Sequence, residues 1–135
     1  MLSLTSLGGA GTVTGSKHLL IHGDTRLLVD CGLFQGLKNL RELNWQRLAV
    51  EPRDIDAVVL THAHLDHCGY LPRLLLDGFG GNIFATTASR DVAELTLLGA
   101  EDKIRSKGKS LGLELDGAEI IDPVNSPQSE EYAAA

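Results

Sequence analysis

The sequence predicts an α/β fold in which a mixed β-sheet is flanked by helices. Two observations support this class. Short aliphatic runs bounded by glycine and polar turn residues recur from the start of the chain, as expected for strands. Farther along, leucines at helical spacing alternate with such runs, which is the element order of an α/β protein. At 135 residues the chain is long enough for one domain with its own core.

Five strands are expected. Each is a short run of aliphatic or β-branched residues that ends at glycine or polar residues. They span residues 2–7, 17–22, 25–32, 56–61 and 82–86. Gly23 and Asp24 stand between the second and third runs, which predicts a hairpin turn there.

The first two helices are expected between the later strands. Leucines recur near helical spacing over 38–50, and Pro52 then ends the helix. The second helix is expected within 69–81, where Gly78 stops it.

The longest predicted helix covers 87–106, with Thr87 or Ser89 as its N-cap. Beyond it the pattern weakens. We therefore expect a folded unit over 1–106, while 107–135 forms a weakly ordered tail or the start of a truncated continuation.

The composition is that of a soluble globular protein, with 43% hydrophobic and 22% charged residues. A formal net charge of −6 argues against a chain that grips nucleic acid through overall basicity. No apolar run approaches the ~18 residues of a membrane span, and no signal peptide is recognisable. Cys31 and Cys68 form no CxxC pair. We expect a cytoplasmic protein without a membrane partner.

The stretch "LTHAHLDHCGYLP" over 60–72 carries the chemistry. His62 and His64 are two residues apart at the end of a strand, so their side chains point to the same side and suit one Zn²⁺. Asp66 and His67 follow in the turn and offer a carboxylate and a third imidazole to a second ion ~3.5–4 Å away. A lone histidine would be read as an ordinary polar residue, but this density indicates half of a two-metal site.

Three stretches resemble a known family. "DAVVLTHAHLDHCGYLP" (56–72) resembles the signature of the metallo-β-lactamase superfamily. "GGAGTVTGSKHLL" (8–20) and "LLVDCGLFQG" (27–36) resemble its β-CASP branch, the RNA-cleaving group that includes bacterial ribonucleases and the mRNA 3′-end-processing endonuclease. The resemblance runs from about residue 2 to about residue 105 and implies that 1–106 is the N-terminal half of an αββα sandwich.

The resemblance also implies roles for individual residues. His62 and His64 would ligate one zinc ion, and Asp66 and His67 the other, with two ions in a complete site. Asp66 would be catalytic as well, because it would orient or deprotonate the attacking metal-bound water. Asp30 would hold the ligands in place, although on sequence alone it could equally be a strand-end turn residue. The implied activity is hydrolysis of an RNA phosphodiester by hydroxide activated between two zinc ions.

The chain departs from the family pattern after His67, because no later histidine occurs. The family needs a further histidine, a bridging aspartate and a last histidine. The aspartates that remain match none of these contexts: Asp77, Asp91, Asp102, Asp116 and Asp122. We expect the N-terminal piece of a longer enzyme or a truncated product, which would bind zinc only partially, be inactive alone, and either self-associate or pair with a missing C-terminal half.

Two other functions stay open. One is a different hydrolase of the same fold, acting on thioesters or lactones, which the stretches "VTGSKHLL" and "DCGLFQG" disfavour. The other is a non-catalytic remnant that binds metal or pairs with another subunit. The absence of any histidine after His67 favours this second alternative.

Several further features have two interpretations. The glycines of 8–20 let that loop approach the metal centre, or simply form a turn between strands. His18 and His22 are interpreted as strand or surface residues rather than ligands. Cys68 is interpreted as a buried structural residue rather than a soft ligand, and Cys31 as an apolar filler. A basic run could contact RNA phosphates or form a solvated helix end; it comprises Lys103, Arg105, Lys107 and Lys109.

Overall fold

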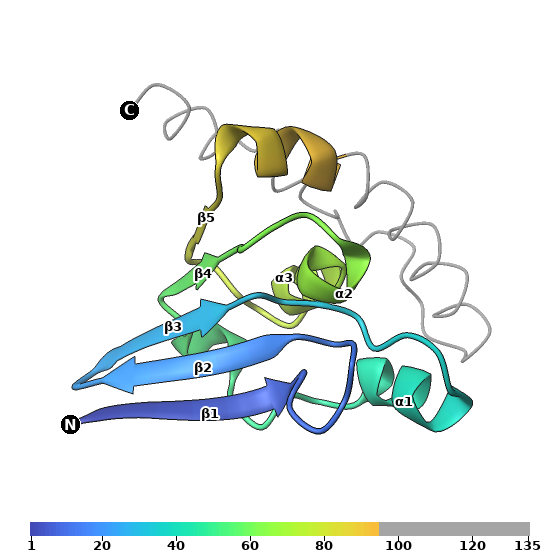
Figure 1. The fold of residues 1–135 in the computed structure, drawn as a ribbon. Helices are drawn as coiled ribbons and strands as arrows, with labels where there is room; N and C mark the ends of the chain where they lie inside the picture. The colour runs from blue at the N-terminus through green and yellow to red at the C-terminus, as the bar shows by residue number, and fades with distance from the viewer. Residues whose placement is uncertain (95–135) are drawn as a thin grey trace.

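The computed structural model describes residues 1–94 and shows a five-stranded mixed sheet (Figure 1). The strands are β1 (Leu2–Gly8), β2 (Lys17–His22), β3 (Thr25–Val29), β4 (Ala57–Val59) and β5 (Asn82–Phe84). They lie side by side in chain order. β1, β2 and β3 are antiparallel neighbours, whereas β3, β4 and β5 run parallel. The predicted α/β class with a mixed sheet is confirmed.

The helices lie in the connections between the parallel strands. They are α1 (Lys38–Glu42), the 3₁₀ turns η1 (Leu43–Trp45) and η2 (Pro52–Asp54), α2 (Leu65–Cys68) and α3 (Leu71–Leu76). Residues 87–94 are also helical. No helix within residues 1–94 is long and apolar enough to cross a membrane.

The predicted helix over 38–50 is wrong in length, because regular helix ends at Glu42 and a 3₁₀ turn follows. The side chain of Asn44 explains the early end. Its Oδ1 accepts a hydrogen bond from the Phe34 backbone N–H at 2.8 Å, and its Nδ2 donates to the Phe34 carbonyl at 2.8 Å. These bonds attach Asn44 to the loop that follows β3, and this attachment replaces the continuation of the α1 helix.

The N-cap prediction for the last helix is also wrong, since Thr86 takes that place rather than Thr87 or Ser89. Thr86 Oγ1 accepts a hydrogen bond from the Ser89 backbone N–H at 3.2 Å. The part of the predicted helix beyond residue 94 and the predicted tail over 107–135 lie outside the described residues.

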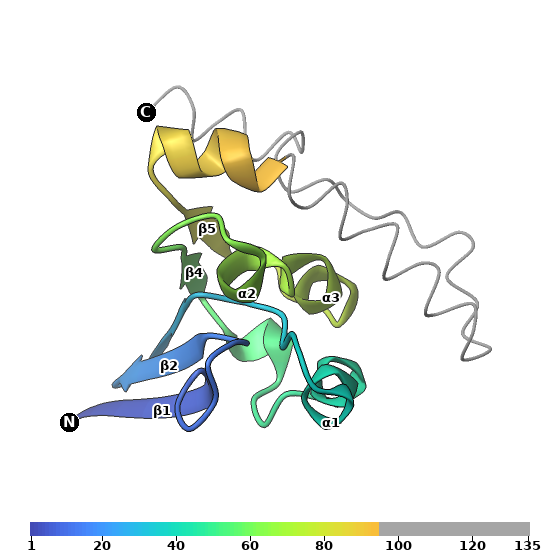
Figure 2. The ribbon, with the colours of Figure 1, turned by 45° about the vertical axis from the view of Figure 1, so that its right-hand side comes forward.

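The core lies between the sheet and α2 and α3, which Figure 2 shows on the same side of the strands. Leu28 and Val58, paired across β3 and β4, are fully buried against Leu74 of α3. Period-2 alternation then places the neighbouring residues of each strand on the other face. That face keeps apolar side chains exposed, with Leu2 at 65% and Leu4 at 64%.

Candidate metal centre

The sequence-predicted residues gather beyond the carboxyl ends of β3 and β4. Asp30 follows β3 directly, and its backbone N–H donates to the carbonyl of Val59, the last residue of β4, at 2.8 Å. Thr61 follows β4 and leads into the histidine cluster. The carboxyl ends of parallel strands are the usual place for sites in α/β sheets.

Asp30 is the centre of the local hydrogen-bond network. Asp30 is 3% exposed. Its φ of 61° is a left-handed conformation, which ends β3 earlier than predicted. Oδ1 accepts the backbone N–H of Thr61 at 2.8 Å, and the Thr61 hydroxyl lies 2.9 Å from both carboxylate oxygens. Oδ2 also accepts from the Ser16 hydroxyl at 3.3 Å. Asp30 is therefore a strand-end turn residue that also takes part in this hydrogen-bond network, and its role in holding metal ligands stays a prediction.

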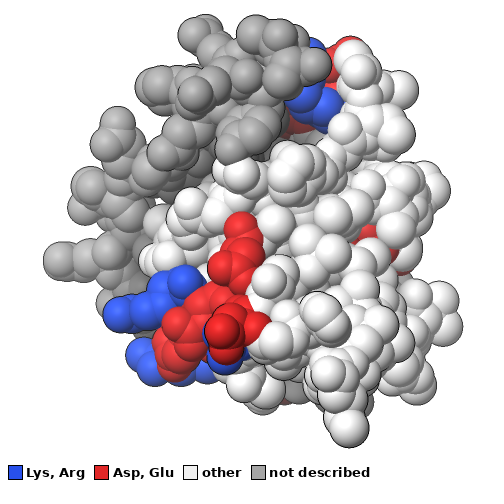
Figure 3. Space-filling model, turned by 90° about the vertical axis from the view of Figure 1, so that its left-hand side faces the viewer, with Lys and Arg blue, Asp and Glu red and all other residues white. Residues whose placement is uncertain are grey.

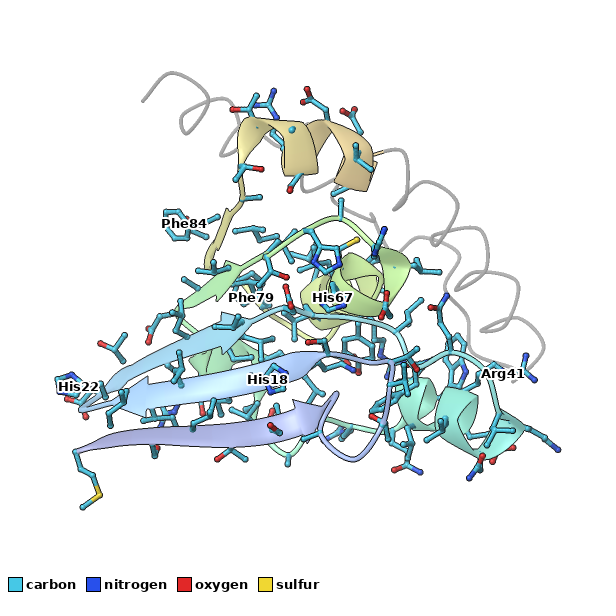
Figure 4. The ribbon with its side chains drawn as sticks, viewed as in Figure 1. His18, His22, Arg41, His67, Phe79 and Phe84 are labelled. Atoms are coloured by element: carbon cyan, nitrogen blue, oxygen red, sulfur yellow. The ribbon has the colours of Figure 1, made fainter. Side chains whose placement is uncertain are left out.

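His67 lies between two carboxylates. Its Nδ1 donates to Asp30 Oδ2 at 2.8 Å, and its Nε2 is 3.3 Å from Asp66 Oδ2. Figure 4 shows His67 on α2, at the edge of the sheet where β3 and β4 end. Because Asp30 takes up Nδ1, the Nε2 atom is the one that faces Asp66.

The other two histidines of the cluster lie against this group. The ring centroid of His62 is 4.0 Å from that of His67 and 4.7 Å from that of His64. The three imidazoles of the cluster therefore lie close together. Within residues 1–94, however, no three His, Cys, Asp or Glu side chains are arranged to hold a metal ion.

The donor set suits zinc in its chemistry. Imidazole nitrogen and carboxylate oxygen are the ligands of catalytic zinc, and a histidine ligand typically donates its other ring N–H to a carboxylate, as His67 does to Asp30. The residues therefore fit part of a zinc site. The individual ligand assignments to His62, His64, Asp66 and His67 stay predictions.

Backbone hydrogen bonds hold the three sequence motifs together. The carbonyls of the first α2 residues accept from other segments: Leu65 from Leu33 at 3.1 Å, Asp66 from Ser16 at 2.9 Å, and His67 from Cys31 at 2.7 Å. Gly32 permits this close approach, because a Cβ there would lie 1.6 Å from the Asp66 carbonyl oxygen. The prediction that the glycine-rich loop approaches the centre is borne out at Ser16.

Lys17 is a buried residue that the sequence analysis missed. It is 1% exposed, with Nζ donating to the Gly15 carbonyl at 3.3 Å. Nζ also lies 4.3 Å from the ring centroid of Phe34 and 4.9 Å from that of Tyr70. Burial lowers the pKa of Lys17 to about 8, against a smaller opposite effect of Cys31. The sequence did contain a signal for this burial, since Lys17 and Leu19 are two residues apart in β2 and their side chains therefore lie on the same, core-facing side of the strand.

Both cysteines behave as structural residues. Cys31 and Cys68 are free and fully buried. The Cys68 thiol donates to the Ala63 carbonyl at 3.5 Å, and burial raises its pKa to about 11. Burial likewise raises the pKa of Cys31 to about 12.

Neither histidine of β2 joins the cluster. His18 Nδ1 is 2.8 Å from the Ser6 hydroxyl, and His22 is exposed at the far end of the strand. Figure 4 shows both of them away from His67. Their interpretation as strand and surface residues is confirmed.

The acidic candidates for later ligands divide into two groups. Asp77 pairs with Arg73 at 2.8 Å, and Asp91 pairs with Arg90 at 3.4 Å. The remaining candidates and the basic run lie outside the described residues: Asp102, Asp116, Asp122, Lys103, Arg105, Lys107 and Lys109. On the face in Figure 3, the Lys and Arg atoms of the described residues lie beside Asp and Glu and form no broad basic surface.

Known proteins resemble this chain over most of its length. Residues 11–79 match the family model described as the metallo-beta-lactamase superfamily. Ribonuclease TTHA0252 of Thermus thermophilus is 45% identical over 96 residues, which cover 71% of this chain and 22% of that protein. Transcription termination factor FttA of Cenarchaeum symbiosum is 39% identical over 112 residues, 80% of this chain and 17% of that protein.

A eukaryotic relative shows the same pattern. Cleavage and polyadenylation specificity factor 73 of Drosophila melanogaster is 33% identical over 93 residues, 68% of this chain and 14% of that protein. The matched segments thus span between 14% and 22% of these relatives' own length.

Proposed function

The chain belongs to the metallo-β-lactamase superfamily, with relatives in its β-CASP ribonuclease branch, and we propose that it supplies part of the catalytic centre of a zinc-dependent, RNA-cleaving phosphodiesterase. The superfamily generally uses zinc. One observation carries the proposal: a buried carboxylate, Asp30, holds His67 against Asp66 within a cluster of three imidazoles.

The residues that would hold zinc are His62, His64, Asp66 and His67. Zinc bound there would lower the pKa of a water molecule toward neutrality and polarise the scissile phosphate. Asp30 keeps the Nδ1 proton of His67 engaged at 2.8 Å, so that Nε2 is available as a ligand. The ring cannot rotate away without breaking this buried bond.

Asp66 is the proposed catalytic residue. Its side chain is 22% exposed, so that a carboxylate oxygen can reach both solvent and the cluster. Asp66 Oδ2 would accept the proton of the attacking water. The position of Asp66 at the start of α2 is fixed because its backbone carbonyl accepts a hydrogen bond from the Ser16 N–H.

RNA is the proposed substrate because the relatives named above include a ribonuclease and a cleavage and polyadenylation factor. The described residues offer no broad basic surface on the face in Figure 3.

A non-catalytic metal-binding role is the second candidate. It is favoured by the absence of any histidine after His67 in the sequence, which leaves the proposed two-metal site without its later ligands. In that case the cluster would bind zinc without turnover.

The experiment is RNA cleavage by the complete polypeptide that carries this chain. Wild type should cleave RNA in a zinc-dependent manner, whereas Asp66→Ala should abolish cleavage and leave the circular dichroism spectrum unchanged. Thioester and lactone substrates test the other hydrolase activities in parallel. Zinc binding without cleavage of any of these substrates would favour the non-catalytic role, and full turnover by Asp66→Ala would refute the role of Asp66.

A further inference from the structure

The hydroxyl of Thr61 stands between Asp30 and a second histidine of the cluster. Thr61 Oγ1 is 2.9 Å from each carboxylate oxygen of Asp30 and 2.9 Å from Nδ1 of His62. His62 makes no direct contact with Asp30 among the hydrogen bonds of the described residues. Thr61 is thus the group that connects the buried carboxylate to this ring.

Proton counting fixes the direction of these bonds. A hydroxyl has one proton to donate, and an ionised carboxylate can only accept. If Thr61 donated to His62, its oxygen lone pairs would face both oxygens of Asp30 at 2.9 Å without a proton between them. Donation to the charged carboxylate is also the stronger bond. The Thr61 oxygen then accepts a hydrogen bond from Nδ1–H of His62.

We infer that Thr61 is a positioning residue, which extends the hydrogen bond of Asp30 to His62 and so holds His62 with its proton on Nδ1 and its Nε2 lone pair free for a metal. The inference rests on the proposed zinc function for its purpose. It concerns a property of the metal-free chain, however, which can be measured separately.

One carboxylate would then set the tautomers of two histidines by different routes. Asp30 acts directly on His67, whose Nδ1 lies 2.8 Å from Oδ2, and acts on His62 through Thr61. The ring of His64 has no hydrogen-bond partner among residues 1–94, and it serves as an internal reference.

Two substitutions of Thr61 separate the hydroxyl from the rest of the residue. Thr61→Val keeps the branched shape and the backbone N–H that donates to Asp30 at 2.8 Å, but it removes the hydroxyl. Thr61→Ser keeps the hydroxyl and should restore the wild-type behaviour. Neither substitution changes a proposed ligand.

The first measurement is the protonation of each imidazole nitrogen in the metal-free 135-residue chain, by nitrogen NMR at a pH where the rings are neutral. In wild type and Thr61→Ser, His62 and His67 should both carry their proton on Nδ1. In Thr61→Val, His62 should shift toward the Nε2–H form, while His67 and His64 keep their wild-type signals. An Nε2–H tautomer of His62 in wild type, or an unchanged tautomer in Thr61→Val, would overturn the inference.

The second measurement is zinc affinity by competition with a chromophoric chelator. Thr61→Val removes the hydrogen-bond partner of the proposed ligand His62 and should weaken zinc binding by about tenfold or more. Thr61→Ser should bind zinc about as tightly as wild type. Equal zinc affinity of wild type and Thr61→Val would contradict a role of Thr61 in metal binding. If no variant bound zinc while the tautomers followed expectation, the zinc function would fail and the positioning of His62 by Thr61 would stand.

Discussion

Nδ1 of His67 donates a hydrogen bond to Oδ2 of Asp30 at 2.8 Å, which joins the end of β3 to the short helix α2. The two residues are 37 positions apart in the sequence, and the bond is shielded because the Asp30 side chain is only 4% exposed. This contact organises the proposed metal centre, since it decides which nitrogen of His67 is free.

Asp30→Asn should weaken zinc binding by about 10–100-fold. The NH₂ group of the new amide would face a hydrogen-bond donor, the Thr61 N–H or the His67 Nδ1–H, in place of an accepting carboxylate oxygen. The same mismatch should lower the free energy of unfolding by about 1–3 kcal/mol. Chelator competition and denaturant titration measure the two effects. Asp91→Asn is the matched control, as Asp91 is exposed and its ion pair among residues 1–94 is with the neighbouring Arg90. Wild-type zinc affinity in Asp30→Asn would refute the ligand-holding role.

Gly32→Ala should destabilise the fold by about 3 kcal/mol or more, since the new Cβ would lie 1.6 Å from the Asp66 carbonyl oxygen. The backbone must then move apart where Ser16 and Cys31 reach α2. Gly80→Ala provides the control, because a Cβ there meets no atom of the described part of the chain within 4 Å. Denaturant titration of both variants makes the comparison, and equal stability would contradict the close packing of the motifs.

Lys17→Met should lose stability relative to wild type as the pH rises from about 8 to 10.5. Burial lowers the pKa of Lys17 from 10.5 to about 8, so at this residue the unfolded chain binds more protons in this window, and the contribution of Lys17 to wild-type stability rises with pH. The stability of Lys17→Met relative to wild type should therefore fall by up to about 3 kcal/mol across it.

The difference between the two proteins is the relevant quantity, because burial also raises the pKa of Cys31 to about 12, of Cys68 to about 11 and of Tyr70 to about 12, and these groups lower stability at high pH in both proteins. Denaturant titrations at several pH values provide it. Parallel stability curves for wild type and Lys17→Met would show that Lys17 keeps an ordinary pKa in the fold.

The sequence predicted the strands and the histidine cluster because both follow from spacing. Short aliphatic and β-branched runs bounded by glycine and polar residues predicted the five strands, and the crowding of His62, His64 and His67 predicted their proximity. The spacing could not give the orientation of the rings, since that depends on Asp30, far away in the chain. Thr61 and Ser16 were missed because hydroxyl residues near a strand end carry no pattern that separates a network member from a turn residue.

Tertiary contacts also explain the errors in the secondary structure. The segment over 38–50 has helical spacing, yet Asn44 binds the backbone of Phe34 and ends the regular helix early. The strand predicted to reach residue 32 ends at Val29, because Asp30 adopts a left-handed conformation to serve the network. In both cases a bond between distant segments overrides the local preference.

The most direct test of the account is the zinc content of the purified 135-residue chain, measured by elemental analysis before and after His62→Ala and His64→Ala. Wild type should hold zinc at fewer than two ions per chain, because no histidine follows His67 to complete the proposed two-metal site. Both substitutions should lower this content. Two tightly held ions in wild type, or a zinc content that neither substitution changes, would contradict the account.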